Sequence, residues 1–214
     1  MNRVWLFGET SDFSKTLLQA VRMETQDVQT FGRRNISYNT HPKEQISIQY
    51  PPDKIIVNLQ VSADKTSDNY DPIERWKDAI CVIEFIASLF EMLEKEGKEV
   101  TIIYITSSVT ISETMHEKEF YKWRDYIAVR HIQQAIWSAY DRRHLKVLAI
   151  SPSRLENHNK QEYAERIVKI LYNPPERRKC ILDLSGGGEW RPLYVIDNIH
   201  YSTHIADVRF GIDK

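Results

Sequence analysis

Three side chains, Ser108, Tyr126 and Arg130, carry groups that together would polarise a carbonyl. Tyr126 and Arg130 lie one turn apart in the helical pattern of residues 119–143, and Ser108 follows the apolar run 100–106. The serine would hold the carbonyl oxygen, the tyrosine would deliver or remove a proton, and the cation would stabilise phenolate. An isolated Y-x-x-x-R pair is more often an exposed polar helix face, so the remaining chain must support this interpretation.

Short apolar strands alternate with amphipathic helices along the chain. This order predicts an α/β fold, a doubly wound parallel sheet between two helix layers, formed by one domain over residues 1–214. A further short strand is expected at 46–50, inside the polar stretch 33–54. The expected strands are 4–8, 28–32, 55–61, 100–106, 146–151 and 179–185, and the expected helices are 13–23, 71–97, 119–143 and 160–171.

The two longest helices are expected to bury apolar stripes. In helix 71–97, which Asp71 can cap and Gly97 ends, Ile86, Leu89 and Leu93 widen the apolar surface, as in a helix buried on two sides. The predicted core stripes are Ile73, Trp76, Ile80, Ile83, Ala87 and Phe90 in this helix, and Ala128, Ile132, Ala135, Ile136 and Ala139 in helix 119–143.

Parallel sheets bind ligands beyond the carboxyl ends of their strands. After the first strand, the turn from Gly8 to Phe13 includes Thr10 and Ser11, small residues that suit a phosphate-binding turn at a helix start. After the second strand come Arg33 and Arg34, where a cation favours the 2′-phosphate of a dinucleotide.

Taken in order, these segments resemble the short-chain dehydrogenases/reductases, a family of NAD(P)-dependent Rossmann enzymes. "VWLFGETSDFS" resembles the first strand and cofactor turn of the family, with Gly8 kept and Asp12 and Ser14 at its later glycines. "IIVNLQVS" resembles the "VNNAG" strand, with Asn58 at its first asparagine, and "ITSS" resembles the catalytic-serine segment. "YIAVR" resembles Y-x-x-x-K with arginine replacing lysine, "ISPS" keeps Pro152 of a "PG" turn, and "ILDLSGGGEW" resembles the last strand.

The resemblance implies hydride exchange between a nicotinamide cofactor and a small carbonyl or alcohol. It assigns Ser108, Tyr126 and Arg130 to catalysis, and Gly8, Thr10, Ser11, Phe13, Arg33, Arg34, Asn58 and Pro152 to the cofactor, with NADP expected over NAD. It also implies a homodimer or homotetramer in which the helices 71–97 and 119–143 pair across a two-fold axis, with Ile86, Leu89 and Leu93 adding apolar surface. The tail 189–214 is a further candidate for the subunit interface. Because residues 33–54 are too short for the family's helix-strand-helix, the adenine pocket is expected to be partly open.

The departures from the family pattern leave three hypotheses open. The first is an NADP(H)-dependent oxidoreductase of low activity, because drift has no reason to keep the serine, tyrosine and cation together. The second is a non-catalytic relative that binds a dinucleotide or another ligand as a sensor or interaction module, which the lost glycines and Arg130 favour. The third is an interaction protein without nucleotide, which Asp12 and the short segment after Arg34 favour.

Composition excludes several other classes of function. The 214 residues have a net charge of −1, with 42% hydrophobic and 28% charged residues, so neither nucleic acid nor an anionic membrane is an expected partner. The two cysteines lie in apolar runs and the seven histidines are scattered, so no metal site is expected. The N-terminal residues do not form the apolar core of a signal peptide, and a reducing cytoplasm is expected.

Overall fold

The computed structural model describes residues 2–59, 72–107, 117–152, 159–176, 180–184 and 189–192. They form one seven-stranded sheet in the order β2-β1-β3-β4-β5-β6-β7, in which all neighbouring strands are parallel except β6 and β7. The strands are β1 (Val4–Phe7), β2 (Val28–Phe31), β3 (Lys54–Val57), β4 (Val100–Ile105), β5 (Leu145–Ser151), β6 (Cys180–Asp183) and β7 (Glu189–Pro192).

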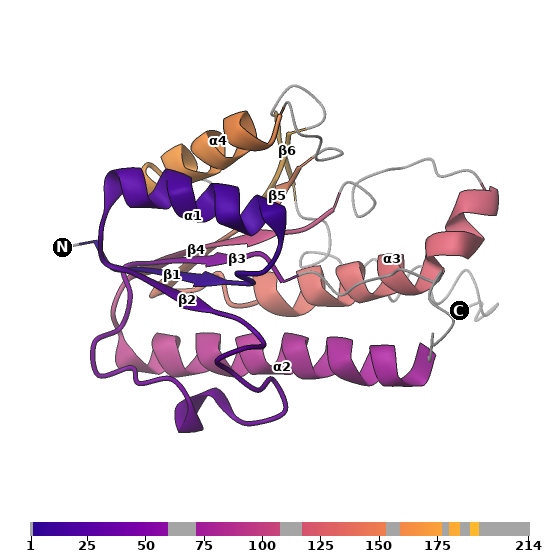
Figure 1. Cartoon of the computed structure of the whole chain (residues 1–214), viewed down its shortest axis with the longest axis horizontal. Helices are drawn as coiled ribbons and strands as arrows, with labels where there is room; N and C mark the ends of the chain where they lie inside the picture. Colours follow the sequence, from indigo (N-terminus) through magenta and orange to yellow (C-terminus); the bar gives the residue numbers. More distant parts are fainter. Residues whose placement is uncertain are drawn as a thin grey trace, which may run out of the picture.

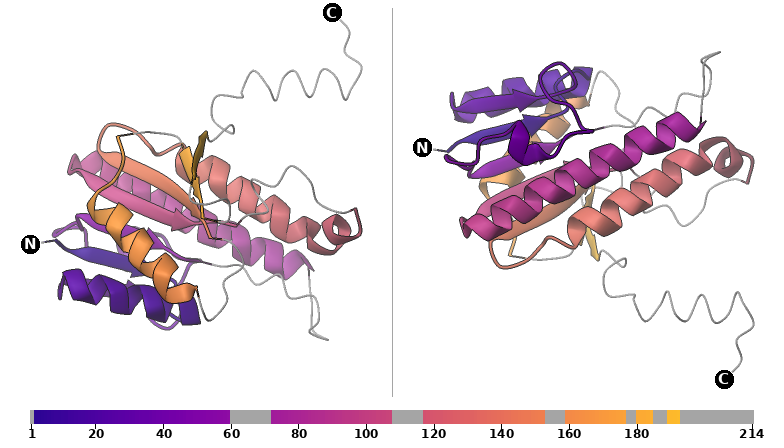
Figure 2. Two further views of the ribbon diagram at one scale, coloured as in Figure 1. Left: turned by 90° about the horizontal axis from the view of Figure 1, so that it is seen from above. Right: turned by 90° about the horizontal axis from the view of Figure 1, so that it is seen from below.

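Helices cover both faces of this sheet, as the alternating sequence pattern predicts (Figures 1 and 2). α1 (Asp12–Glu24) and α4 (Lys160–Tyr172) lie side by side on one face, and α2 (Pro72–Glu96) and α3 (Glu117–Ser138) lie on the other. Each face buries its own apolar cluster, because successive strand residues point to opposite sides. The central strands β4 and β5 are apolar and buried nearly throughout, as strands covered on both faces are.

The buried faces of α2 and α3 differ from the predicted stripes. On α2, Ile73 and Ile80 are 66% and 39% exposed, whereas Ile86, Leu89 and Leu93 are fully buried in the core of the chain itself. These three residues therefore cannot provide a subunit interface. On α3 the most buried positions are Arg130, Gln133, Gln134, Trp137 and Ser138, while Ile132 and Ile136 are only half-buried and Ala139 is exposed.

The segment between β2 and β3 covers part of the α2 face without forming a strand. The predicted strand at 46–50 is absent from this described stretch, and its first residue, Ile46, is instead a buried side chain. Ile36 and Tyr38 join the same core cluster, with the Tyr38 ring edge-on to Phe85 at 5.1 Å. A short 3₁₀ turn, η1 (Pro42–Glu44), contacts α2. The segment is therefore an irregular, packed cover of the α2 face, in which the expected loss of the regular helix is confirmed and the openness of the adenine pocket stays a prediction.

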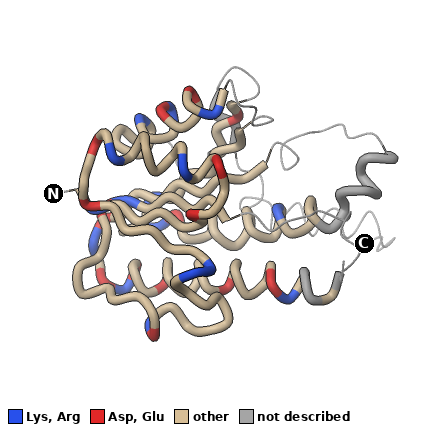
Figure 3. Tube along the Cα trace, in the orientation of Figure 1, with Lys and Arg blue, Asp and Glu red and all other residues tan. Residues whose placement is uncertain are grey.

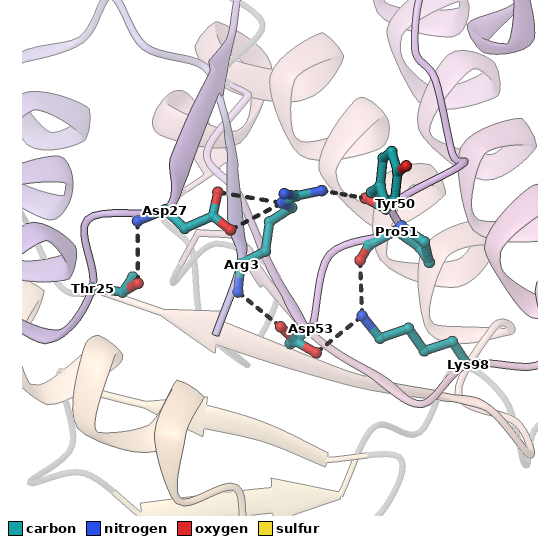
Figure 4. A network of polar contacts seen from close by, with 7 residues as sticks. All are labelled: Arg3, Thr25, Asp27, Tyr50, Pro51, Asp53 and Lys98. Atoms are coloured by element: carbon teal, nitrogen blue, oxygen red, sulfur yellow. Dashed lines mark hydrogen bonds and ion pairs between the residues drawn. The ribbon is translucent and has the colours of Figure 1, made fainter. Parts of the chain in front are cut away.

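A polar network at the amino end of the sheet holds the last residues of this cover, Tyr50 to Asp53 (Figure 4). The Arg3 side chain donates to Asp27 at 3.1 Å and to the Tyr50 carbonyl at 2.9 Å, and its main-chain N–H donates to Asp53 at 2.7 Å. Lys98 Nζ lies 3.0 Å from the Asp53 carboxylate and 2.8 Å from the Pro51 carbonyl. These contacts join the starts of β1, β2 and β3.

Two features near the ends of elements were not predicted. α3 ends at Ser138, short of the expected Arg143. Residues 189–192 form the antiparallel edge strand β7, so the start of the predicted interface tail pairs with the sheet of its own chain. The rest of that tail, 193–214, and the capping residue Asp71 lie outside the described residues. Within the described parts of the chain, no helix combines the length and apolar character needed to cross a bilayer.

Candidate functional site

The carboxyl ends of β1 and β3 meet at the point where the chain changes direction across the sheet. From β1 the chain passes through α1 to β2 at the sheet edge, and from β2 it returns past β1 to β3 on its other side. In open α/β sheets such a switch point is where ligands bind. Gly8 follows β1 here and Asn58 follows β3, so the structure brings these two predicted cofactor residues together.

Gly8 permits an approach between the two strand ends that no other residue would allow. Its φ is +95°, a conformation that side chains with a Cβ rarely adopt, and an added Cβ would lie 2.2 Å from the Asn58 carbonyl oxygen. The Gly8 N–H donates to the Phe31 carbonyl at 2.8 Å, and the Asn58 N–H donates to the Phe7 carbonyl at 2.9 Å. The first glycine of the turn is thus required by geometry.

Two serine hydroxyls close the turn, and one of them, Ser14, occupies a position where the family has a glycine. Ser11 caps α1 by accepting from the Ser14 N–H at 3.1 Å, and the buried Ser14 hydroxyl donates to the Gly8 carbonyl. Asn58 Nδ2 lies 2.8 Å from Ser14 Oγ and 3.2 Å from Ser11 Oγ. The Asp12 side chain is 77% exposed and pairs with Lys15, so it points away from this network.

Other residues predicted to bind the cofactor are placed less directly. Phe13 is 3% exposed and its ring packs between α1 and the sheet, so only its main chain could reach a ligand. Thr10 is exposed at the turn, and Pro152 is buried after β5.

The end of β2 carries both the two predicted arginines and an unpredicted carboxylate. Arg33 is paired with Asp78 of α2, and this hydrogen bond raises the pKa of the guanidinium above its ordinary value. Arg34 is exposed. Glu9 accepts from Thr30 Oγ1 at 3.0 Å and lies over Gly32, where an added Cβ would be 2.8 Å from Glu9 Cγ.

Tyr38 lines the same edge of the molecule. Its phenol is buried without a hydrogen-bond partner, and this burial raises the pKa of Tyr38 above its ordinary value. Arg33 and Glu9 lie close enough to act on this phenol in opposite directions, the guanidinium lowering its pKa and the carboxylate raising it. The end of β2 therefore presents charges of both signs, where the sequence indicated only cations.

Arg130 is buried under Tyr126 rather than exposed on a polar helix face. Its Cζ lies 5.1 Å from the centroid of the half-buried Tyr126 ring, a cation–π arrangement, and the residue is 2% exposed. Nη1 donates to the Leu59 and Ile105 carbonyls, both at 3.4 Å, and to Gln133 Oε1 at 2.8 Å. The guanidinium thus joins α3 to the ends of β3 and β4, beside Asn58. It is the single Asp, Glu, Lys or Arg residue between Tyr126 and Ser138 (Figure 3).

Several buried polar atoms near this guanidinium have no hydrogen-bond partner among the described residues. Thr106 directly follows β4, and Ser151 is the last residue of the adjacent strand β5. Because side chains alternate along a strand, both point to the face of the sheet that α3 covers. Sequence reasoning placed both positions at strand ends but did not single them out. The partnerless atoms are Asn58 Oδ1, Thr106 Oγ1, Arg130 Nε, Gln133 Nε2, Gln134 Oε1 and Ser151 Oγ.

The predicted serine Ser108 lies outside the described residues. Of the residues leading to it, Thr106 is buried and Ser107 is half-buried. Among the described His, Cys, Asp and Glu side chains, none form a group of three or more that could hold a metal ion.

Comparison with known proteins identifies relatives by fold. No family model and no curated protein matches the sequence. A carbonyl reductase from Pseudomonas aeruginosa PAO1, solved in complex with NADP, superposes with a TM-score of 0.62 at 12% identity over 90% of this chain and 100% of its own. A short-chain dehydrogenase from Streptomyces avermitilis superposes with a TM-score of 0.59 at 12% identity, over 100% and 99% of the two chains.

The chain has the fold of the short-chain dehydrogenases/reductases. A larger protein, a GDP-L-fucose synthetase from Naegleria fowleri bound to NADP, matches with a TM-score of 0.56 at 11% identity over 72% of this chain and 51% of its own. The predicted Rossmann architecture is therefore confirmed.

The geometry of the turn fits a dinucleotide in this fold. Gly8 lets the ends of β1 and β3 meet at the switch point, α1 begins beside them, and the buried Asn58 Oδ1 has no donor among the described residues.

Proposed function

We propose that this protein is an NADP(H)-dependent oxidoreductase that reduces a carbonyl or oxidises an alcohol. The observation that carries the proposal is the buried Arg130 guanidinium stacked on Tyr126, next to the switch point where Gly8 and Asn58 meet. The guanidinium stacked on the ring lies next to the phenol that would transfer the proton. The fold shared with NADP-bound reductases supports the same reaction class.

In this proposal the turn from Gly8 to Ser11, the start of α1, Asn58 and Pro152 hold the cofactor, which supplies the hydride. Tyr126 gives its phenolic proton to the carbonyl oxygen, and Arg130 stabilises the phenolate that remains. Ser108 would hold the carbonyl oxygen, the role that its position in the family motif implies. Arginine cannot pass the proton onward as lysine can, so reprotonation of Tyr126 must use another route, and turnover is expected to be slow.

NADP(H) is the favoured cofactor because Arg33 and Arg34 follow β2. Arg33 would contribute less to binding the 2′-phosphate than a free arginine, since Asp78 already accepts a hydrogen bond from its guanidinium. The Glu9 carboxylate beside Gly32 opposes a 2′-phosphate at the same strand end. We therefore propose a preference for NADPH over NADH that is smaller than two free arginines would produce.

A panel of aldehydes and ketones with NADPH tests the proposed reaction. Tyr126→Phe should lower kcat by about 10²–10⁴-fold, the usual contribution of a lost acid–base group. Arg130→Lys should keep or raise turnover of neutral ketones, because lysine restores a proton relay. Tyr140→Phe is a matched control, since this tyrosine also stacks with an arginine, Arg142, but lies near the end of α3. Equal activity of wild type and Tyr126→Phe would refute the catalytic role of Tyr126.

A non-catalytic dinucleotide-binding protein is the second candidate. It is favoured by the Nη1 bonds of Arg130, which tie the cation to the carbonyls of Leu59 and Ile105 as a structural clamp would. In that case NADPH binds in calorimetry, no carbonyl is reduced, and Arg130→Lys does not restore turnover.

A further inference from the structure

Arg130 is a buried cation without a carboxylate. Its three hydrogen bonds all leave from Nη1 and end on carbonyl or amide oxygens, and no carboxylate of the described residues pairs with it. A guanidinium removed from water loses several kcal/mol of hydration, which carbonyl oxygens and a π-face offset only in part. An anion brought into contact with it would recover more.

The uncommitted edge of the guanidinium has a defined shape. Nε is buried and has no acceptor among the described residues. It shares one edge of the guanidinium with Nη2, and such an edge carries two parallel N–H donors. This is the geometry that a carboxylate accepts in a bidentate pair. Gln133 Nε2 and Thr106 Oγ1 are further donors without an acceptor, the first on the glutamine that Arg130 contacts and the second on the residue after Ile105.

We propose that the substrate carries a carboxylate next to the reacting carbonyl, as in a 2-oxo acid, and that Arg130 binds this carboxylate through Nε and Nη2. The inference rests on the proposed reaction, in which Tyr126 is the proton donor. Because the guanidinium stacks on the Tyr126 ring, the proposed anion site lies next to the proton donor. Reduction then forms the 2-hydroxy acid: the carbonyl carbon gains the hydride of NADPH, its oxygen gains the Tyr126 proton, and NADP⁺ is released.

A carboxylate is favoured over a phosphate by the charge of the site. The described contacts of Arg130 bring no second cation to it, so a singly charged planar group matches the one positive charge.

Paired substrates that differ only in charge test the proposal. Turnover with NADPH is compared for 2-oxobutanoate and its methyl ester, and for phenylglyoxylate and its methyl ester. We expect the acids to have kcat/KM values about tenfold to a hundredfold above those of the esters, mainly through KM, as a charge-assisted bidentate pair provides. Arg130→Lys should reduce this acid-to-ester ratio severalfold, whatever its effect on the turnover of the esters themselves. Arg142→Gln, which removes an exposed arginine from a tyrosine face, should leave the ratio unchanged.

Calorimetry with the same four compounds separates this inference from the proposed reaction. If no compound is reduced but the acids bind and the esters do not, and Arg130→Lys weakens acid binding, the anion site stands and the oxidoreductase proposal fails. If acids and esters are reduced or bound equally, the anion site is refuted while the reaction stands. Arg130 is then a structural clamp, and Arg130→Gln lowers stability without changing the acid-to-ester ratio. Absence of binding by all four compounds also overturns the inference.

Discussion

Replacing Gly8 with alanine tests the strand contact on which the whole site depends. Both Gly8 and Gly97 have positive φ, +95° and +72°, but they differ in surroundings. A Cβ at Gly97 would meet nothing within 4 Å, so Gly97→Ala carries only the conformational cost, about 1–2 kcal/mol. It is therefore a matched control for the backbone part of the effect.

At Gly8 a steric cost is added to the conformational one. The new Cβ would lie 2.2 Å from the Asn58 oxygen and 2.7 Å from its carbonyl carbon, both below the 3.0 Å limit of real contacts. These are main-chain atoms at the end of a central strand and cannot rotate away. Relief requires β1 and β3 to separate, which weakens the 2.9 Å bond from the Asn58 N–H to the Phe7 carbonyl. Because strain and a lost buried hydrogen bond add about 1–3 kcal/mol to the conformational cost, we expect Gly8→Ala to lower the free energy of unfolding by roughly 2–5 kcal/mol in total.

Urea unfolding of wild type, Gly8→Ala and Gly97→Ala measures the difference, with equal m-values required for the comparison. Gly8→Ala should also weaken NADPH binding in calorimetry at temperatures where it is folded, whereas Gly97→Ala should not. Equal destabilisation by the two substitutions would show that the β1 and β3 ends do not approach as described.

Three further predictions concern acid stability, cofactor choice and assembly. Burial on its own raises the pKa of Asp53, but Lys98 and the Arg3 N–H outweigh it and hold that pKa below its ordinary value. The ionised carboxylate therefore stabilises the fold above the ordinary pKa of aspartate, and this contribution is lost as the pH falls through the lowered pKa. Asp53→Asn should lower the free energy of unfolding by about 1 kcal/mol near pH 7 and flatten its dependence on pH between about pH 3 and 5, as measured by urea unfolding. An unchanged pH dependence would contradict this. Glu9→Gln should tighten NADPH severalfold relative to NADH, and Arg33→Ala with Arg34→Ala should abolish the NADPH preference; equal affinities for both cofactors in wild type would refute the cationic site. We also propose a dimer through the outer faces of α2 and α3, because Ile73 and Ile80 of α2 are exposed. Light scattering should give the mass of a dimer at micromolar concentration for wild type and of a monomer for Ile80→Glu. A monomeric wild type would exclude this dimer.

The sheet and its helices were predictable from local patterns. Continuous apolar runs such as 100–106 indicate strands covered on both faces, and the alternation of strands with helical periods indicates a parallel sheet. The glycine after the first strand and the asparagine inside the expected strand 55–61 lie together where β1 and β3 end, and their role in binding a cofactor stays a prediction. The predicted strand at 46–50 is wrong because Ile46 and Ile48 pack against the core from an irregular segment, and alternation of apolar and polar residues cannot distinguish such a segment from a strand.

The polar side chains of the site depended on tertiary structure. By sequence, Ser14 is a lost glycine, but in the fold its hydroxyl bonds the Gly8 carbonyl and Asn58. Arg130 lies on the side of α3 opposite the alanine and isoleucine pattern, so periodicity indicated that it was exposed.

The amino-acid sequence thus determined the order of the elements and the residue types at the strand ends, because strand alternation and helical period are local properties. Only the tertiary structure decided which of these polar groups are buried together. The carbonyls of Leu59 and Ile105, 71 and 25 residues from Arg130 along the chain, accept from its guanidinium only after β3, β4 and α3 have packed.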